Sequence, residues 1–271
     1  MLLSSGVIAF SNRPAGVNMI LDAFSLKGKV AIVTGCDTGL GQGISVGLAE
    51  AGCDIVGVNR KYPHDTEQKV TALGQRFMAI QADLSKQDGL ENIVSEVVSQ
   101  MGRVDILVNN AGTIRRADAL DFSEKDWDDV INLNLKSLFF LSQAVARQFI
   151  AQGGGGKIIN IASMLSFQGG IRVPSYTASK SGVLGLTRLL ANEWATHNIN
   201  VNAIAPGYMA TNNTQQLRED AQRNQEILDR IPAARWGAPD DLKGPAVFLA
   251  SGASDYVNGF TLAVDGGWLA R

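Results

Sequence analysis

The sequence predicts an α/β fold: a single doubly wound domain with a seven-stranded parallel sheet and helices on both faces. From Lys29 onward, short β-branched runs alternate with longer segments of helical periodicity. That order is typical of a parallel sheet whose crossover connections are helices. The runs form one series without an internal repeat or a clear linker, and 271 residues is a common length for one such domain. We therefore expect the domain to cover residues 24–271.

Each predicted strand is a short apolar run bounded by turn residues. The runs are Val30–Thr34, Asp54–Asn59, Phe77–Gln81, Ile106–Asn109, Lys157–Ile161, Asn200–Ile204 and Phe260–Val264. The predicted helices lie between them, at residues 41–51, 65–74, 88–101, 124–151, 174–197 and 240–250.

Two stretches between these elements have an unusual composition. Four glycines at 153–156 follow a helix and precede a strand. A phosphate-binding loop needs the reverse order, so we interpret them as a surface turn. Residues 212–231 are strongly polar. They predict a weakly packed helical insertion, which is either a lid over a site or a plain exposed helix.

Charge and composition exclude several functions. The formal net charge is −2 and no basic run stands out, which argues against nucleic acid or an anionic membrane as a partner. No apolar run reaches the roughly 18 residues of a membrane span. The cysteines, Cys36 and Cys53, do not make a disulfide framework, so we expect a cytoplasmic protein. The isolated His64 and His197 predict no metal site.

Residues 1–23 are predicted to be an N-terminal extension outside the domain. Their mildly apolar start is interrupted by Asn12, Arg13 and Pro14 and lacks a charged leading region, which makes a poor signal peptide. We expect this extension to be disordered or loosely docked.

A glycine-rich loop follows the first predicted strand and opens a helix. It reads Thr34-Gly-Cys-Asp-Thr-Gly-Leu-Gly41. Such glycines let the chain turn sharply and let backbone N–H groups approach a pyrophosphate at the helix N-terminus. The position of the loop therefore predicts a Rossmann-type dinucleotide site, whose contacts are Gly35, Asp37, Thr38, Gly39, Leu40 and Gly41.

The end of the second strand bears on the choice of cofactor. An acidic residue usually binds the adenosine ribose there, but this chain has Asn59 followed by Arg60. Asn59 can still bind the ribose and Arg60 could favour NADP, whereas Asp37 would repel a 2′-phosphate. The residues favour NAD(H) and leave NADP open. Asp83 and Leu84, after the third strand, are predicted adenine contacts; the alternative for Asp83 is a helix N-cap.

Tyr176 and Lys180 predict acid–base chemistry. They are four residues apart, so a helix presents them on one face. A free tyrosine has a pKa of about 10, and a nearby ammonium would lower that pKa. Ser163 lies at the end of the fifth strand, where ligands bind in such sheets.

Together these pieces resemble the short-chain dehydrogenase/reductase family over residues 26–271. The matching stretches, in chain order, are TGCDTGLG at 34–41, NNAG at 109–112, NLNLK at 132–136, Ser163, YTASK at 176–180 and PGYMAT at 206–211.

The resemblance implies a role for each matched residue. Tyr176 would be the general acid in reduction and the general base in oxidation. Lys180 would bind the nicotinamide ribose and lower the tyrosine pKa, and Ser163 would hydrogen-bond the substrate oxygen. Asn134 would hold a water that relays protons toward Lys180. Tyr176 and Lys180 would also contact the cofactor, together with Asn110, Ala111, Gly112, Pro206, Gly207, Met209 and Thr211.

A finer resemblance concerns the substrate. TIRR after NNAG, residues 161–180 and 206–215, and the ending VDGGWLAR are similar to the 2-dehydro-3-deoxy-D-gluconate 5-dehydrogenase group within that family. This implies a keto-deoxy sugar acid substrate, NAD(H) and a homotetramer. It also implies that Met19 is the natural start. The alternatives are a gluconate 5-dehydrogenase or another polyol or ketone reductase, and a non-catalytic dinucleotide-binding scaffold.

Two adjacent arginines, Arg115 and Arg116, follow the fourth strand and should leave the sheet near the site. A carboxylate is well matched by the charged, fork-shaped guanidinium group. We therefore expect at least one of them to bind the substrate carboxylate, with Arg172 and Gln168 as further candidates. The other is expected to face an acidic partner on a neighbouring helix or subunit.

Overall fold

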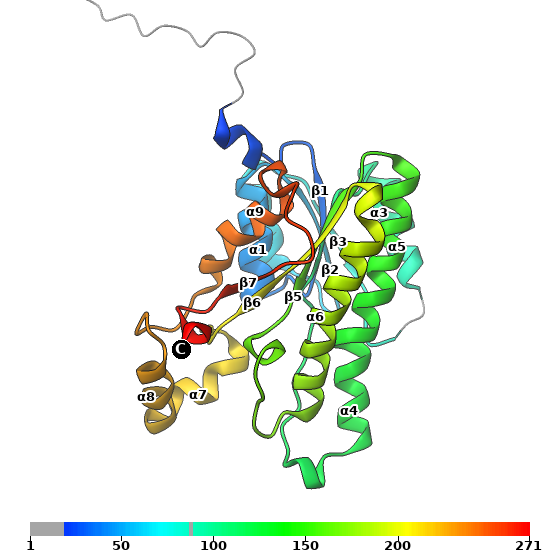
Figure 1. Ribbon diagram of the computed structural model, residues 1–271. Helices are drawn as coiled ribbons and strands as arrows, with labels where there is room; N and C mark the ends of the chain where they lie inside the picture. The colour runs from blue at the N-terminus through cyan, green and yellow to red at the C-terminus, as the bar shows by residue number, and fades with distance from the viewer. Residues whose placement is uncertain (1–18, 87–88) are drawn as a thin grey trace, which may run out of the picture.

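The computed structural model describes residues 19–86 and 89–271 (Figure 1). The predictions for residues 1–18, including the choice of Met19 as the start, lie outside this range. The strands are β1 (Val30–Thr34), β2 (Asp54–Asn59), β3 (Phe77–Gln81), β4 (Ile106–Asn109), β5 (Gly156–Ile161), β6 (Ile199–Pro206) and β7 (Thr261–Val264). They form one sheet in the order β3-β2-β1-β4-β5-β6-β7, and every neighbouring pair is parallel. The predicted fold class is confirmed.

Helices cover both faces of the sheet (Figure 1). One face carries α3 (Leu90–Met101), α5 (Ser137–Gln152) and α6 (Pro174–Trp194), with α4 (Glu124–Ile131) packed against α6. The other face carries α1 (Gly39–Glu50), α2 (His64–Ala72) and α9 (Lys243–Ala250).

The side chains of β1 show why both faces must be covered. Val30 and Ile32 lie in the core beneath α3 and α5, whereas Ala31 and Val33 lie in the core beneath α1 and α9. All five residues of β1 are buried. Alternate residues of a strand point to opposite faces, so a continuously apolar strand needs helices on both sides.

The sheet reverses its direction of growth at β1, which pairs with β2 on one side and β4 on the other. In open α/β sheets, ligands bind in the crevice at the carboxyl ends of the strands at such a switch point. A ligand-binding site is therefore expected at the loops that follow β1 and β4.

The helix predicted at 124–151 is interrupted in the structure. A π-helical turn, Asn132–Lys136, separates α4 from α5. The prediction failed because the apolar periodicity continues through the turn. A tertiary contact of Asn134, described below, accompanies the change of register, and single π-turns are frequent at functional sites.

Residues 212–231 form a 3₁₀ turn and two helices, α7 (Gln215–Glu219) and α8 (Ala221–Arg230). The Asp220 side chain caps α8 by accepting from the Arg223 N–H at 3.0 Å. The expectation of weak packing is confirmed for most of the stretch, in which only Ile227 and Ile231 are buried. The sequence reads as polar because only one narrow face of α8 is apolar.

The remaining regular elements are short. The 3₁₀ turns are Ile20–Phe24, Ala119–Asp121, Met164–Ser166, Ala195–His197, Asn212–Thr214, Pro239–Leu242, Gly252–Ser254 and Trp268–Ala270. Gly153, Gly154 and Gly155 have positive φ and form the predicted turn before β5. Across residues 19–86 and 89–271, no helix combines the length and apolarity needed to cross a bilayer.

Candidate active site

The glycine loop connects β1 to α1, as predicted, and its glycines are sterically required. Gly35 and Gly39 adopt left-handed φ values of 66° and 56°. A Cβ on Gly41 would overlap the Gly35 carbonyl oxygen. The loop brings backbone N–H groups to the start of α1, the arrangement that suits a diphosphate.

The loop after β4 is tied to the glycine loop. The Thr34 hydroxyl accepts from the backbone N–H groups of Asn110 and Ala111 at 3.0 and 2.9 Å. The Asn110 amide donates back to the carbonyls of Thr34 and Gly35 at 3.0 and 2.8 Å. These bonds fix the two loops at the switch point, and sequence reasoning did not identify Thr34 as their centre.

The segment after β6 closes the same crevice. The Thr211 Cγ2 lies 3.5 Å from where a Cβ on Gly39 would stand. Met209 is buried among core residues that include Ile44 of α1. A Cβ on Gly207 would lie 2.6 Å from the Asp265 Cα, so this position must be small. The predicted cofactor contacts at 206–211 therefore lie beside those of the glycine loop.

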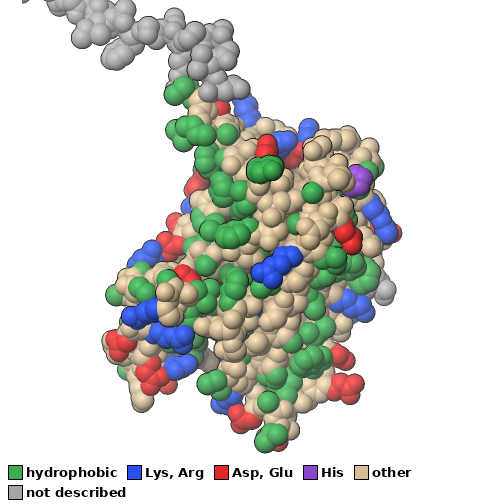
Figure 2. All heavy atoms as spheres, viewed as in Figure 1, with side chains coloured by type: hydrophobic (Ala, Val, Ile, Leu, Met, Phe, Trp, Pro, Cys, Tyr) green, Lys and Arg blue, Asp and Glu red, His purple; other side chains and the backbone are tan. Residues whose placement is uncertain are grey.

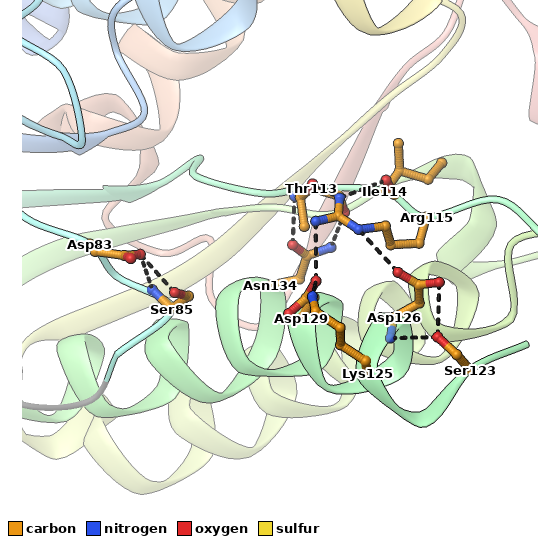
Figure 3. A network of polar contacts seen from close by, with 10 residues as sticks. All are labelled: Asp83, Ser85, Thr113, Ile114, Arg115, Ser123, Lys125, Asp126, Asp129 and Asn134. Atoms are coloured by element: carbon orange, nitrogen blue, oxygen red, sulfur yellow. Dashed lines mark hydrogen bonds and ion pairs between the residues drawn. The ribbon is translucent and has the colours of Figure 1, made fainter.

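The ends of β2 and β3 provide the outer wall of this crevice. Asn59 is buried, its Nδ2 donates to the Cys36 Sγ at 3.2 Å, and its Oδ1 is buried without a hydrogen-bond partner. Asp83 accepts from the Ser85 N–H and hydroxyl at 3.1 and 2.7 Å (Figure 3).

Those two bonds place Asp83 at a turn rather than at a helix N-cap, since α3 begins only at Leu90. The hydrogen bond from Ser85 lowers the pKa of Asp83, and the charge of Arg60 adds a smaller effect in the same direction. Asp83 and Arg60 therefore lie close enough to interact.

Three of the predicted catalytic residues come together at the end of β5. Ser163 caps the 3₁₀ turn that follows the strand, and its side chain lowers the pKa of Tyr176, which lies in the first turn of α6. Lys180 lies one turn further, with its Nζ 5.6 Å from the centre of the Tyr176 ring. The lysine side chain is buried, and its Nζ donates to the Ile161 carbonyl at 2.6 Å.

Burial dominates the electrostatics of this group. It lowers the pKa of Lys180 from 10.5 to about 8. It raises the pKa of Tyr176, and the Ser163 hydrogen bond and the charge of Arg116 only partly oppose the increase. This differs from the expected lowering by Lys180, because the ammonium is directed to the Ile161 carbonyl.

Asn134 is fully engaged by its neighbours. Its Oδ1 accepts from the Thr113 N–H at 2.8 Å, and its Nδ2 donates to the Thr113 carbonyl and the Ser179 hydroxyl at 2.9 and 3.2 Å. The π-turn thus fastens the loop after β4 to the helix of Tyr176 and Lys180. Both Nδ2 hydrogens have protein acceptors, so the side chain could hold the predicted water only through the second lone pair of its Oδ1.

Arg115 points away from the crevice (Figure 3). It forms ion pairs with Asp126 and Asp129 of α4 at 3.4 and 3.2 Å and also donates to the Thr113 hydroxyl at 2.9 Å. This is the acidic partner on a neighbouring helix that was expected for one of the two arginines.

Arg116 is the other arginine of the pair, and it is exposed. Among the described residues, no hydrogen bond or ion pair holds its guanidinium. Its charge nevertheless acts on Tyr176. Arg116 is therefore the arginine of the pair that lies toward the site.

The other two predicted substrate residues already have partners. The Nε of Arg172 lies 3.1 Å from Asp118, and its φ of 64° is unusual for a residue with a Cβ. The Arg172 carbonyl accepts from the Ala117 N–H at 3.1 Å, so this residue braces the loop of Arg116. The Gln168 Oε1 accepts from Arg230 of α8 at 3.5 Å.

Ser166 was missed at the level of sequence. Its hydroxyl donates to the Lys180 carbonyl at 2.6 Å and accepts from the Ser163 N–H at 3.3 Å. It therefore joins the end of β5 to α6 between two predicted catalytic residues. The sequence feature that could have identified Ser166 is its position three residues after Ser163.

Comparisons with known proteins agree with this geometry. The sequence profile of the short chain dehydrogenase family matches residues 29–222. The 2-dehydro-3-deoxy-D-gluconate 5-dehydrogenases of Escherichia coli (strain K12) and Dickeya dadantii (strain 3937) are each 75% identical to this chain over 253 residues, which are 93% of this chain and 100% of each relative.

A solved structure from Agrobacterium tumefaciens, named provisionally as a 2-deoxy-D-gluconate 3-dehydrogenase and containing NADP, superimposes with a TM-score of 0.87. It is 57% identical and covers 92% of this chain and 100% of its own. On the sequence profile, the relatives and the shared architecture, the chain belongs to the short-chain dehydrogenase family.

Proposed function

We propose that this protein is a nicotinamide-dependent dehydrogenase that interconverts a ketone and a secondary alcohol on a keto-deoxy sugar acid, 2-dehydro-3-deoxy-D-gluconate. The observation that carries the proposal is the cluster of Ser163, Tyr176 and Lys180 with an unpaired arginine, Arg116, acting on the tyrosine. The two relatives of 75% identity bear the name of this activity.

The residues fit a dinucleotide. The crevice combines a glycine cradle that a Cβ on Gly41 would fill with a buried, unpartnered acceptor, the Asn59 Oδ1. The glycine loop would hold the diphosphate, and residues 206–211 would lie along the nicotinamide end. When bound, the nicotinamide supplies or accepts the hydride.

The protein supplies position, proton and charge. In reduction, Tyr176 donates its proton to the substrate oxygen as the hydride reaches the carbon; in oxidation, it accepts the hydroxyl proton. Ser163 donates a hydrogen bond to the same oxygen. The raised pKa of Tyr176 keeps its proton on the phenol, and an ammonium of Lys180 directed at the phenol would lower that pKa.

The mutation Tyr176→Phe tests this role. It should remove most turnover in an NADH absorbance assay, while NADH binding, measured by fluorescence titration, survives. Near-normal turnover in this variant would end the proposed mechanism.

Arg116 is proposed to bind the substrate carboxylate, since Arg115 is occupied by two aspartates. Arg116→Ala should raise KM for the sugar acid more than for a neutral keto sugar. Arg115→Ala is the matched control and should lower thermal stability without this selectivity. An equal rise in KM for both substrates in Arg116→Ala would show that this arginine has a structural role instead.

NAD(H) is proposed as the preferred cofactor. The Asn59 Oδ1 is buried without a partner, which leaves an acceptor for a ribose hydroxyl, whereas its Nδ2 already donates to the Cys36 Sγ. Asp37 in the glycine loop adds repulsion. Because the Agrobacterium structure contains NADP, comparison of kcat/KM for NADH and NADPH is decisive. Equal values would refute the preference.

The same assays test the alternative functions. A gluconate 5-dehydrogenase or a general polyol reductase would show higher kcat/KM for gluconate or neutral sugars than for the keto-deoxy acid. A binding-only scaffold would show no absorbance change with any of them. The grouping of Tyr176 and Lys180, with the lysine Nζ 5.6 Å from the tyrosine ring centre, favours an enzyme.

We also propose a homotetramer in a reducing cytoplasm. Apolar side chains gather over α5 and α6 (Figure 2); Phe140, Ile150 and Leu189 are 41%, 47% and 45% exposed. Phe260, next to β7, is 57% exposed and would belong to a second interface. Both described cysteines are free and buried. Light scattering of Phe140→Glu should show smaller particles than the unmodified protein.

A further inference from the structure

We propose that Arg230, on α8, is a second contact for the acid group of the substrate and that the C-terminal segment Trp268–Arg271 holds it in place. This inference rests on the proposed sugar-acid function. Arg230 lies in the polar stretch 212–231, and Trp268 and Arg271 lie in the ending VDGGWLAR. The packing of α8 brings these residues together.

A small apolar core fastens α8 next to the catalytic serine. Ile227 and Ile231 are buried together with Trp268 and with Met164, the residue that follows Ser163. Tyr208, from the segment after β6, packs edge-on against the Trp268 ring with centroids 4.8 Å apart. The helix therefore packs against residues from both the Ser163 turn and the segment after β6, and Figure 1 shows α8 beside the C-terminus.

The C-terminal segment clamps the last turn of α8 at two points. The Arg271 guanidinium donates to the carbonyls of Asp229 and Arg230 at 2.8 and 3.2 Å. A cation at the C-terminal end of a helix satisfies its free carbonyls and complements its dipole. The Trp268 ring lies beneath the Arg230 guanidinium, 3.9 Å from ring centre to Cζ.

This stacking orients Arg230 and leaves its donors available. Cation–π contact uses the face of the guanidinium, whereas carboxylates are bound by its edge. In the described part of the chain, no carboxylate lies within ion-pair distance of Arg230. Its one side-chain hydrogen bond goes to the Gln168 Oε1 at 3.5 Å, the weak end of the range.

The contact with Gln168 places the hydrogen-bonding edge of the Arg230 guanidinium next to the candidate active site. Its backbone N–H donates to the Met164 carbonyl at 3.2 Å, within the loop that runs from Ser163 to Tyr176. Basic side chains gather over α8 and the C-terminal turn (Figure 2). Arg223 on the same helix is neutralised by Glu226 at 2.9 Å. An oriented cation without an acid, next to the catalytic loop, fits an anionic substrate group.

The decisive variant is Arg230→Gln, with Arg223→Gln on the same helix as the matched control. Loss of a charge-assisted hydrogen bond should raise KM for the sugar acid about tenfold. We expect kcat to stay within about twofold and KM for a neutral keto sugar to be unchanged. The dissociation constant of the acid, titrated by tryptophan fluorescence, should rise in parallel.

A second set of variants tests whether the C-terminal segment Trp268–Arg271 positions Arg230. Trp268→Leu and Arg271→Ala should each raise KM for the acid without lowering kcat, and Trp268→Phe should restore part of the affinity. Arg271→Ala serves if Trp268→Leu does not fold. An unchanged acid KM in Arg230→Gln would overturn the proposal, as would an equal rise for acid and neutral substrates.

These outcomes are distinguishable from failure of the proposed function. If the unmodified protein does not turn over the sugar acid, the function itself is wrong. If it does, and Arg116→Ala shows selective loss but Arg230→Gln matches its control, only the role of Arg230 is refuted.

Discussion

The buried ammonium of Lys180 should give the protein an unusual dependence of stability on pH. Burial lowers its pKa in the folded state from 10.5 to about 8. Between these values the folded protein has released this proton while the unfolded chain still holds it. The free energy of unfolding must therefore rise with pH in this window, because the unfolded state binds more protons.

The size of this contribution follows from the shift. Each pKa unit corresponds to about 1.4 kcal/mol. The shift at Lys180 therefore amounts to about 3 kcal/mol, fully developed only near pH 10.5. Lys180 is 5% exposed, so solvent screening removes little of this figure. Below pH 8 Lys180 is protonated in both the folded and the unfolded state. The folded protein then bears the full free-energy cost of burying the ammonium.

The mutation Lys180→Met removes this titration. Urea unfolding of both proteins from pH 7 to 10 gives the difference in unfolding free energy, in which other titrating groups largely cancel. That difference should change by about 2–3 kcal/mol in favour of the unmodified protein as pH rises. Lys125→Met, at an exposed lysine, controls for the loss of one charge. A difference constant within about 0.5 kcal/mol would show that burial does not govern Lys180.

Three further predictions concern residues that hold the site together. Gly41→Ala should abolish cofactor binding in a fluorescence titration, because its Cβ overlaps the Gly35 carbonyl; Gly185→Ala, with open space around it, should instead stabilise α6 by up to about 1 kcal/mol. Asn134→Ala should lower the unfolding free energy by about 2–4 kcal/mol in urea, since it strands two backbone groups of Thr113; Asn134→Asp, which keeps the acceptor, should lose less. Ser166→Ala should reduce kcat several-fold with unchanged NADH affinity, whereas Ser181→Ala, at an exposed serine, should leave kcat unaltered.

Local patterns were sufficient for the strands and for part of the site. The buried strands are nearly continuous apolar runs because both faces of the sheet are covered. Composition gave the limits of β1 to β4, whereas β6 runs from Ile199 to Pro206, beyond the predicted range of Asn200–Ile204 at both ends. Ser163, Tyr176 and Lys180 could be grouped because a strand end and a helical spacing of four residues are local features.

Side-chain partners from distant segments could not be predicted in the same way. Arg115 and Arg116 are adjacent and chemically identical in sequence. Only the packing of α4 beside the loop, which presents Asp126 and Asp129, decides which one is neutralised. The π-turn at Asn134 similarly depends on Thr113, 21 residues away.

By itself, the sequence determined the doubly wound sheet, the glycine loop and the placement of Tyr176 and Lys180 on one helix, because each depends on spacing within one element or one connection. The tertiary structure alone decided the direction of each charged group. It directed Lys180 to the Ile161 carbonyl, left Arg116 unpaired and stacked Arg230 on Trp268. The physical reason is that charge–charge and hydrogen-bond energies depend on distance and burial, which exist only once remote segments have packed together.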